Sequence, residues 1–172
     1  MIWLICGATH TGKTVLAQRI LEEKRVPYLS LDHLKMGLIR SGGTAVTPVS
    51  PLREITDAVW PVAREMARTC LENGQSLTVE GCYIPPDWEK DFSQRERRQM
   101  RCACLALSEE YIRKNWTAVR AHACDVEQRQ EDDVDAAALL RENQFFRENY
   151  ENVCVIRENW AAETEALLRR IL

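Results

Sequence analysis

The sequence predicts an α/β protein in which helices connect the strands of a parallel sheet. Five short apolar runs are typical of buried strands, and they cover Ile2–Cys6, Tyr28–Leu31, Leu77–Gly81, Cys102–Leu107 and Val153–Arg157. The segments between these runs have helical periodicity, as the crossover connections of a parallel sheet require. With 172 residues, 45% of them hydrophobic, the chain is long enough for one domain with its own core.

The first three helices follow the first two strands. The first is expected over Lys13–Lys24 and the second directly after Asp32, whose side chain is a good N-cap, as far as Ser41-Gly42-Gly43. The longest covers Leu52–Glu72, where apolar residues repeat at helical spacing. Pro61 lies inside this pattern and predicts a kink or a break into two pieces.

The second half of the chain contains two clear helical signals and several irregular stretches. Ser108 can cap a helix, because two glutamates in the following turn complement the helix dipole, and a final helix is expected over Trp160–Leu172. Irregular structure is expected where proline, glycine or dense charge interrupts the pattern, over Gly43–Pro51, Tyr83–Lys90 and Ala121–Asp135.

Residues 7–14, called the glycine loop below, match the phosphate-binding (Walker A) pattern G-x-x-x-x-G-K-[ST]. A strand precedes the pattern and a helix follows it, so backbone N–H groups and the helix dipole can build an anion site there. The Lys13 ammonium can reach the β- and γ-phosphates of a nucleotide, and the Thr14 hydroxyl can bind Mg²⁺. The predicted nucleotide-binding residues of the loop are Gly7, Thr9, His10, Thr11, Gly12, Lys13 and Thr14.

Acidic residues follow the second and third strands. Asp32 comes directly after the second strand and Glu80 ends the third, and both ends open on the sheet edge that carries the glycine loop. Asp32 can accept the proton of an attacking hydroxyl or help to hold Mg²⁺, and it can equally be a plain N-cap. Glu80 is the second candidate for Mg²⁺ beside Thr14, with a structural ion pair as the alternative. Gly81 allows an acceptor molecule to approach closely.

Cationic side chains are expected to complete the site, because phosphoryl transfer needs positive charge around the γ-phosphate. Arg113 and Arg120 are the predicted phosphate contacts from the segment after Ser108, and Arg120 is also a predicted catalytic residue. Lys35 and Arg40 are placed to bind an anionic group of the acceptor. Further arginines in or after the polar Ala121–Asp135 stretch are candidates for the same work, namely Arg129, Arg141 and Arg147.

Composition limits the other roles of the chain. A net charge of −3 does not indicate binding to nucleic acid or to anionic membranes. No apolar run reaches the length of a membrane span, and the chain opens on a strand rather than a signal peptide. Seven scattered cysteines are typical of free thiols in a reducing cytoplasm, and Cys102-x-Cys104, the only close pair, has no second pair with which to bind zinc. None of the three histidines pairs with another at metal-ligand spacing.

Taken in order, these residues resemble the nucleoside-monophosphate-kinase-like group of P-loop kinases. The match consists of the glycine loop, Asp32, Glu80-Gly81 and an arginine-bearing segment, each after its strand. The resemblance implies a three-layer P-loop NTPase fold with a five-stranded parallel sheet of order 2-3-1-4-5. It also implies ATP and Mg²⁺ as cofactors, and one kinase domain over 1–172 with a helical lid inserted at about 117–135.

Parts of the chain resemble individual members of this group. Ser30–Lys35 followed by Ser41-Gly42 is similar to the acceptor region of adenylate kinases, although the lid lacks their Gly-Arg signature and zinc cysteines. The acid after the second strand resembles that of shikimate and gluconate kinases, chloramphenicol phosphotransferase and zeta toxins, where it faces an acceptor hydroxyl. Residues 32–37 and 77–81 are further similar to proteins labelled adenylate kinase or 2-phosphoglycerate kinase.

The main hypothesis is an ATP-dependent kinase that phosphorylates a hydroxyl-bearing metabolite. Its partner is then a small-molecule acceptor, and the protein is expected to be a cytoplasmic monomer or homodimer. A nucleoside monophosphate kinase is the alternative, in which Lys35 or Arg40 holds the acceptor phosphate and no general base is needed. A non-catalytic ATP-binding module is the alternative of another class. The sequence has no Asn-Lys-x-Asp segment and no Asp-x-x-Gly switch, which argues against a GTPase.

Overall fold

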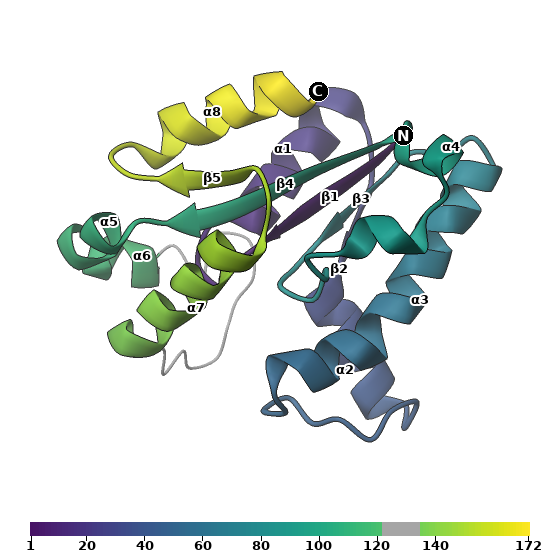
Figure 1. Cartoon of the computed structure of the whole chain (residues 1–172), viewed down its shortest axis with the longest axis horizontal. Helices are drawn as coiled ribbons and strands as arrows, with labels where there is room; N and C mark the ends of the chain where they lie inside the picture. Colours follow the sequence, from purple (N-terminus) through teal and green to yellow (C-terminus); the bar gives the residue numbers. More distant parts are fainter. Residues whose placement is uncertain (122–134) are drawn as a thin grey trace.

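The computed structural model describes residues 1–121 and 135–172, and its centre is a five-stranded parallel sheet (Figure 1). The strand order is β2-β3-β1-β4-β5, and every neighbouring pair is parallel. The strands are β1 (Ile2–Gly7), β2 (Tyr28–Ser30), β3 (Leu77–Glu80), β4 (Met100–Leu107) and β5 (Val153–Ile156). The predicted fold class and strand order are therefore confirmed.

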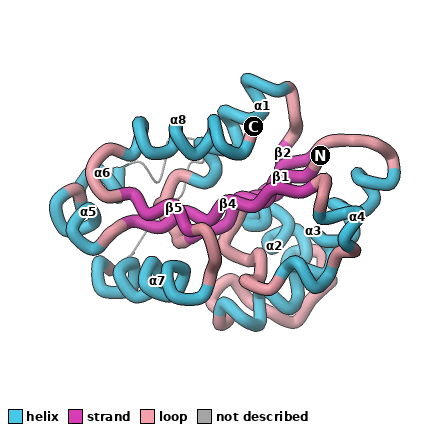
Figure 2. The backbone as a smooth tube through the Cα atoms, turned by 45° about the horizontal axis from the view of Figure 1, so that its top comes forward, coloured by secondary structure: helices cyan, strands magenta, loops and turns pink. Residues whose placement is uncertain are grey.

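Helices cover both faces of the sheet and make three layers (Figure 2). One face carries α1 and α8, and the opposite face carries α2, α3, α4 and α7, while α5 and α6 lie beyond the ends of β4 and β5. The helices are α1 (Lys13–Lys24), α2 (Leu31–Arg40), α3 (Leu52–Glu72), α4 (Gln94–Arg97), α5 (Glu109–Lys114), α6 (Trp116–Ala121), α7 (Ala136–Asn149) and α8 (Trp160–Ile171). A short 3₁₀ helix, η1 (Trp88–Asp91), precedes α4.

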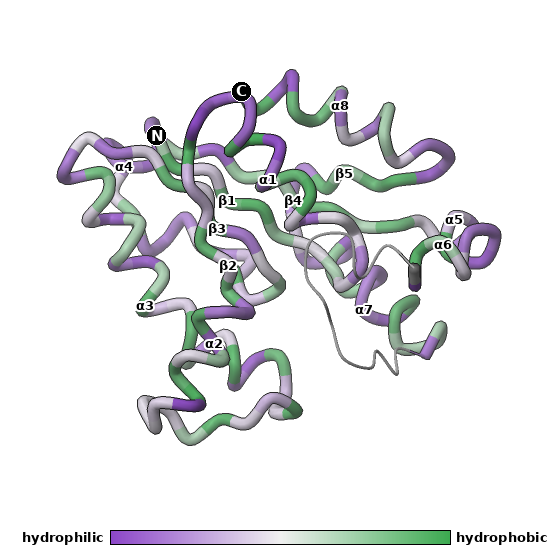
Figure 3. Tube along the Cα trace, turned by 180° about the vertical axis from the view of Figure 1, so that it is seen from behind, coloured by the Kyte–Doolittle hydropathy of each residue, from purple (hydrophilic) through white to green (hydrophobic). Residues whose placement is uncertain are grey.

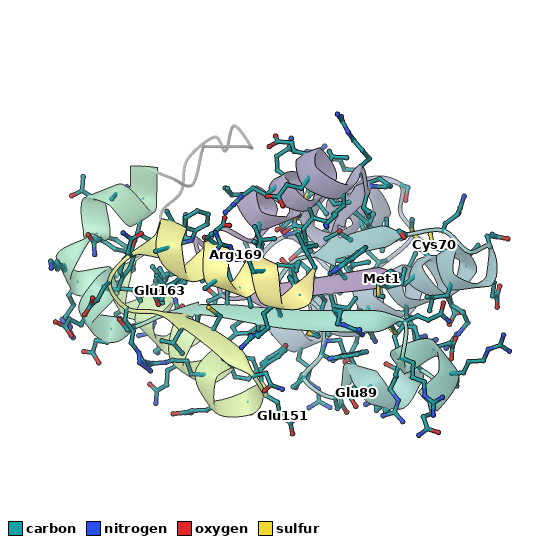
Figure 4. The ribbon with its side chains drawn as sticks, turned by 90° about the horizontal axis from the view of Figure 1, so that it is seen from above. Met1, Cys70, Glu89, Glu151, Glu163 and Arg169 are labelled. Atoms are coloured by element: carbon teal, nitrogen blue, oxygen red, sulfur yellow. The ribbon has the colours of Figure 1, made fainter. Side chains whose placement is uncertain are left out.

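Each face of the sheet packs against its helical layer through a separate apolar cluster. Leu16 of α1 and Leu167 of α8 pack with Ile5 of β1 on one face, while Val59 of α3 and Phe146 of α7 belong to the cluster on the other. The hydrophobic colour of the central strands in Figure 3 follows from this, since parallel strands covered on both faces are apolar throughout. In Figure 4, α8 lies along the sheet with Glu163 towards its start and Arg169 towards its end.

The start of α2 differs from the prediction. The strand β2 ends at Ser30 and α2 begins at Leu31, so Ser30 takes the N-cap position and Asp32 lies within the first turn. The prediction of Asp32 as an N-cap is therefore wrong, because the chain turns from strand into helix without an intervening loop. The Asp32 carboxylate still carries negative charge near the positive end of the helix dipole, where it is favourable.

The long helix does not break into two pieces at Pro61. The helix α3 runs over the whole predicted range with Pro61 inside it. Pro61 and Asp57 both face solvent. The Asp57 carbonyl, which loses its helical partner because proline has no N–H, is therefore on the hydrated side of the helix, where water can replace the missing bond.

Two short elements that were not predicted precede β4. The 3₁₀ helix η1 begins within the Tyr83–Lys90 stretch, where irregular chain was expected, and α4 follows it. Ser93 accepts a hydrogen bond from the backbone of Glu96 and the Glu96 side chain accepts one from the backbone of Ser93, which is a capping box. The pattern Ser-x-x-Glu at 93–96 is the local signal that predicts this start.

The predicted lid falls largely on residues 122–134, which lie outside the described residues. Its first residues, 117–121, belong to α6, and Asp135 at its other end takes the N-cap position of α7. None of the helices in the described part of the chain combines the length and the apolar character that a membrane span requires.

Candidate functional site

The carboxyl ends of β1, β2 and β3 bring the glycine loop, Asp32 and Glu80 to one edge of the sheet. The loop joins β1 to α1, since Gly7 is the last residue of the strand and Lys13 is the first residue of the helix (Figure 1). Asp32 and Glu80 both act electrostatically on the Lys13 ammonium. The residues that the sequence assigns to separate parts of a phosphate site are therefore neighbours.

The glycine loop is held in shape by Trp160, the first residue of α8. Gly12 is left-handed with a φ of 85°, and a Cβ atom there would lie 2.4 Å from the Trp160 ring. The Trp160 indole Nε1 donates a hydrogen bond to the Thr11 carbonyl at 2.8 Å. Gly12 is also the N-cap residue of α1 and supplies no side-chain cap, so the N–H groups of the first turn are available to an anion.

Lys13 is buried and keeps its positive charge. Its ammonium donates a 2.7 Å hydrogen bond to the Ala8 carbonyl, inside the curve of the glycine loop. Burial works against the charge, but the surrounding Cys82, Glu80 and Glu142 side chains outweigh this effect and raise the pKa of Lys13 above its usual value. A fixed cation therefore lies at the centre of the loop.

Thr14 and Glu80 supply two oxygen atoms suited to a magnesium ion. The Thr14 hydroxyl donates to Glu80 Oε2 at 3.4 Å, and Glu80 is buried at the end of β3. Within the described residues, no three His, Cys, Asp or Glu side chains form a group that can hold a metal by themselves. The pair therefore fits an ion that takes its remaining ligands from phosphate oxygens and water, as Mg²⁺ does in nucleotide sites.

Asp32 is part of a three-residue network at the start of α2. Lys35 Nζ donates to Asp32 Oδ1 at 2.7 Å and to the Tyr83 hydroxyl at 2.8 Å, and the Tyr83 hydroxyl lies 3.4 Å from Asp32 Oδ1. Burial opposes the Lys35 charge, but the adjacent Asp32 raises the pKa of Lys35 above its usual value. Burial raises the pKa of Tyr83 to about 12. Lys35 is therefore bound to Asp32 and Tyr83 in this arrangement.

A second carboxylate, Glu142 of α7, contacts the glycine loop directly. Glu142 Oε1 accepts hydrogen bonds from the Thr9 backbone N–H at 3.1 Å and from the Thr9 hydroxyl at 3.0 Å. The Thr9 hydroxyl also lies 3.9 Å from the Cys82 sulfur. Burial raises the pKa of the Cys82 thiol to about 11, and both Glu142 and Asp32 add to this shift. Cys82 therefore experiences the charge of both carboxylates.

An aromatic cavity of about 160 Å³ adjoins the glycine loop on the side of α5, α6 and α8. It is lined by His10, Gly12, Val15, Leu107, Tyr111, Val119 and Trp160. Complete ligand sites are typically larger, about 300 Å³ or more, so this cavity suits one ring system of a larger ligand. Its Tyr111 and Trp160 rings offer flat apolar surfaces for such a ring.

The predicted arginine contacts are exposed or lie outside the described residues. Arg113 is exposed and pairs with Glu109 at 2.7 Å, and Arg120 is exposed with its guanidinium 6.0 Å from the Trp116 ring. Arg129 lies outside the described residues. Their contact with phosphate stays a prediction.

The other predicted cations are also at the surface. Arg40 is exposed in the last turn of α2, and Arg141 is exposed on α7. Arg147 lines a polar cavity with Arg157. Gly81 packs against Leu31, where an added Cβ would lie 2.7 Å from the Leu31 Cβ. In the structure, the group that lies close to Gly81 is therefore Leu31, the first residue of α2.

Three contributors to the site were not predicted from the sequence, namely Cys82, Glu142 and Trp160. Cys82 directly follows Glu80-Gly81, so its position after a strand was a usable signal. Glu142 and Trp160 meet the loop across 133 and 149 residues of sequence. No local pattern marks such contacts, because they depend on how α7 and α8 pack on the sheet.

Comparison with models of protein families and with curated proteins gives no match to the sequence. Solved structures, however, share the fold. The chain aligns over 98% of its length with 92% of a sugar kinase from Janibacter sp. HTCC2649, at a TM-score of 0.58 and 15% identity.

Two further solved kinases are similar over nearly their whole length. A shikimate kinase from Bacteroides thetaiotaomicron aligns over 99% of this chain and 97% of its own, with a TM-score of 0.54 and 13% identity. A gluconokinase from Sinorhizobium meliloti 1021 aligns over 98% and 91%, with a TM-score of 0.52 and 17% identity. At such identities the likeness is one of fold, and the chain has the three-layer α/β fold found in these P-loop kinases.

Proposed function

We propose that the protein is an ATP-dependent kinase that transfers the γ-phosphate to a hydroxyl group of a small molecule. The observation that carries the proposal is the carboxylate of Asp32, held by Lys35 and Tyr83 beside a glycine loop whose Lys13 is buried and charged. A phosphate-binding loop alone serves many reactions, whereas a carboxylate fixed at its open side suits the activation of a hydroxyl.

The nucleotide has a binding surface on each side of the glycine loop. The aromatic cavity suits the base, which stacks on Tyr111 or Trp160. The first-turn N–H groups of α1 suit the phosphates, and Lys13 exchanges the Ala8 carbonyl for a phosphate oxygen. Thr14 and Glu80 would hold Mg²⁺, which supplies charge neutralisation on the phosphates when bound.

In the proposed reaction, the acceptor hydroxyl oxygen forms a bond to the γ-phosphorus. The bond from that phosphorus to the oxygen bridging the β- and γ-phosphates breaks, and ADP leaves with the electron pair. The hydroxyl proton passes to Asp32 and from there to water. Lys35 and Tyr83 orient the Asp32 carboxylate, and Lys13 stabilises the charge that develops on the transferred group. Arg120 is the proposed additional cation.

The proposal is tested by measuring acceptor-dependent ADP formation over a panel of hydroxyl metabolites and nucleoside monophosphates. We expect turnover that needs both MgATP and a hydroxyl acceptor. Asp32→Asn should lower kcat by about 10²- to 10⁴-fold, and Lys13→Met by about 10²- to 10³-fold. Asp57→Asn, an exposed aspartate on α3, is the matched control and should keep full activity.

Other outcomes separate the remaining functions. Transfer to a nucleoside monophosphate that does not depend on Asp32 would favour the adenylate-type alternative. Binding of MgATP with no transfer to any acceptor would favour a non-catalytic ATP-binding module. Full activity of Asp32→Asn with a hydroxyl acceptor would remove Asp32 from the mechanism.

A further inference from the structure

We infer that the acceptor is a hydroxyl compound without negative charge, namely a polyol or a hydroxylated amine such as an amino sugar. Glu142 of α7 is the residue that determines this preference. The inference rests on the proposed kinase function and names the substrate class of the same site. It is carried by the position and charge of the side chains on the open side of the glycine loop.

Two carboxylates approach the loop from different helices. Asp32 comes from α2, and Glu142 comes from α7 and is bonded to Thr9 at 3.0 and 3.1 Å. Both helices lie on the same face of the sheet (Figure 2). The two carboxylates are linked through adjacent residues, since the Thr9 hydroxyl lies 3.9 Å from the Cys82 sulfur and the Tyr83 hydroxyl lies 3.4 Å from Asp32 Oδ1. An acceptor that receives phosphate here therefore lies within the field of Asp32 and Glu142.

Within the part of the chain that the structure describes, the positive charges beside these carboxylates are already engaged. Lys13 belongs to the nucleotide phosphates in the proposed reaction. Lys35 is bound to Asp32 and to the Tyr83 hydroxyl, and its side chain is only 12% exposed. A carboxylate or phosphate group on the acceptor would need to break this pairing and would face two like charges. Apart from Lys35, α2 offers Arg40 as a cation for an acceptor anion, and Arg40 is exposed in the last turn of the helix.

The same groups suit a neutral or cationic acceptor. One hydroxyl of the acceptor can donate to Asp32, which is the contact that the transfer requires. A second hydroxyl or an ammonium group can donate to Glu142, because Thr9 uses only Oε1 of that carboxylate. An ammonium group gains the most, since its bond to a carboxylate is charge-assisted. The site thus selects on charge as well as on the presence of a hydroxyl.

The test compares acceptors that share a carbon skeleton and differ in charge, using ADP formation by the whole protein with MgATP. The probes are glucitol, glucosamine and gluconate, with glycerol and glycerate as a second set. We expect kcat/KM at least tenfold higher for the uncharged or aminated member of a set than for its carboxylate.

Variants of α7 then assign the preference to Glu142. Glu142→Gln should shift the ratio of kcat/KM at least tenfold towards the carboxylate, mainly through KM, and Glu142→Asp should restore the original ratio. Glu148→Gln is the matched control, because Glu148 is exposed on the same helix and bonded to Gln144. It should leave the ratio unchanged. A Tm in MgADP equal to that of the wild type shows that each variant is folded.

Three outcomes would count against the inference. Preference for gluconate or glycerate would overturn it and leave the proposed hydroxyl kinase function standing. A ratio that Glu142→Gln leaves unchanged would remove Glu142 as its cause. ADP formation with none of these compounds and with no other acceptor of the wider panel, in a protein that binds MgATP, would overturn the proposed function and this inference together.

Discussion

Burial and neighbouring charge set the protonation states of single side chains around the glycine loop. Lys13 and Lys35 keep their protons because carboxylates lie beside them, and Tyr83 and Cys82 keep theirs because the ionised forms are poorly solvated. At neutral pH the site therefore contains two ammonium groups, a neutral phenol and a neutral thiol. Asp32 is the group of its network suited to accept a proton.

The Cys82 thiol makes the stability of the protein depend on alkaline pH. Its pKa is raised from 9.0 to about 11, so between these values the folded state holds a proton that the unfolded state has lost. This contribution to stability is complete below pH 9 and is lost as the pH rises through 11. Between pH 8 and pH 10.5, the free energy of unfolding measured with urea should fall by about 2 kcal/mol more in the wild type than in Cys82→Ala.

Cys70→Ala is the control for this comparison, since Cys70 is a half-buried thiol on α3. It should show the same pH dependence as the wild type. Equal slopes for wild type and Cys82→Ala would mean that the Cys82 thiol titrates normally, and they would contradict the described burial of this residue.

The residues of the site were predictable where their signal is local. The pattern of the glycine loop marks Lys13 and Thr14, and the ends of apolar runs mark Asp32 and Glu80. The structure joins Thr14 with Glu80 and joins Asp32 with Lys35, as these positions suggest. Glu142 was not predictable, since a glutamate on a helix is ordinarily a solvated residue and only the packing of α7 brings it to Thr9.

At the scale of elements, α7 is attached to the sheet through one buried amide. Asn143 Oδ1 accepts a 2.6 Å hydrogen bond from the backbone N–H of Leu107 at the end of β4, and Asn143 Nδ2 donates to the Leu139 carbonyl. Asn143 is 1% exposed. Because Asn143 directly follows Glu142 in the sequence, its hydrogen bond to Leu107 also fixes the position of Glu142 beside the glycine loop.

Replacing this amide should loosen α7 and weaken the protein. Asn143→Leu keeps the size of the side chain but leaves the buried Leu107 N–H without an acceptor, which should cost about 1 to 3 kcal/mol of unfolding free energy. Urea denaturation measures the loss. Asn149→Leu, an exposed change at the end of the same helix, should cost less than about 0.5 kcal/mol. If Asn143→Leu were as stable as this control, the hydrogen bond from Leu107 to Asn143 would contribute nothing to stability.

Element boundaries were predicted with uneven success for physical reasons. The strands β1 and β3 follow from buried apolar runs, and α1, α3 and α8 follow from helical spacing with clear stops. The start of α2 was misplaced, because no loop separates it from β2. The alternative of a break at Pro61 was wrong, since its exposed side of α3 lets water replace the lost hydrogen bond.

The architecture of the whole molecule was the most predictable feature. Five apolar runs separated by helical segments leave a parallel sheet as the only compact solution that buries both faces of each strand, and the sheet order implied by the family resemblance is confirmed. The glycine loop lies at the centre of this architecture, contacting α8 through Thr11 and α7 through Thr9. A ligand held by the loop therefore stabilises the helical layers on both faces of the sheet (Figure 2).

Nucleotide binding should accordingly raise the stability of the folded protein. At a free MgADP concentration 100 times its Kd, the expected gain is about 2.7 kcal/mol. For a chain of this size that gain corresponds to a rise in Tm of about 5 to 10 °C. Differential scanning fluorimetry measures the shift. Lys13→Met should lose most of it, and an equal shift in wild type and Lys13→Met would place the nucleotide elsewhere on the molecule.

The central claim, transfer of the γ-phosphate to a hydroxyl next to Asp32, is tested most directly by ³¹P NMR of a reaction with MgATP and the best acceptor of the panel. We expect the γ-phosphate signal to be replaced by the signals of ADP and a phosphate monoester in equal amounts, at a rate that is at least about 100-fold lower in Asp32→Asn. Formation of ADP and inorganic phosphate without a monoester, or an undiminished rate in Asp32→Asn, would contradict it.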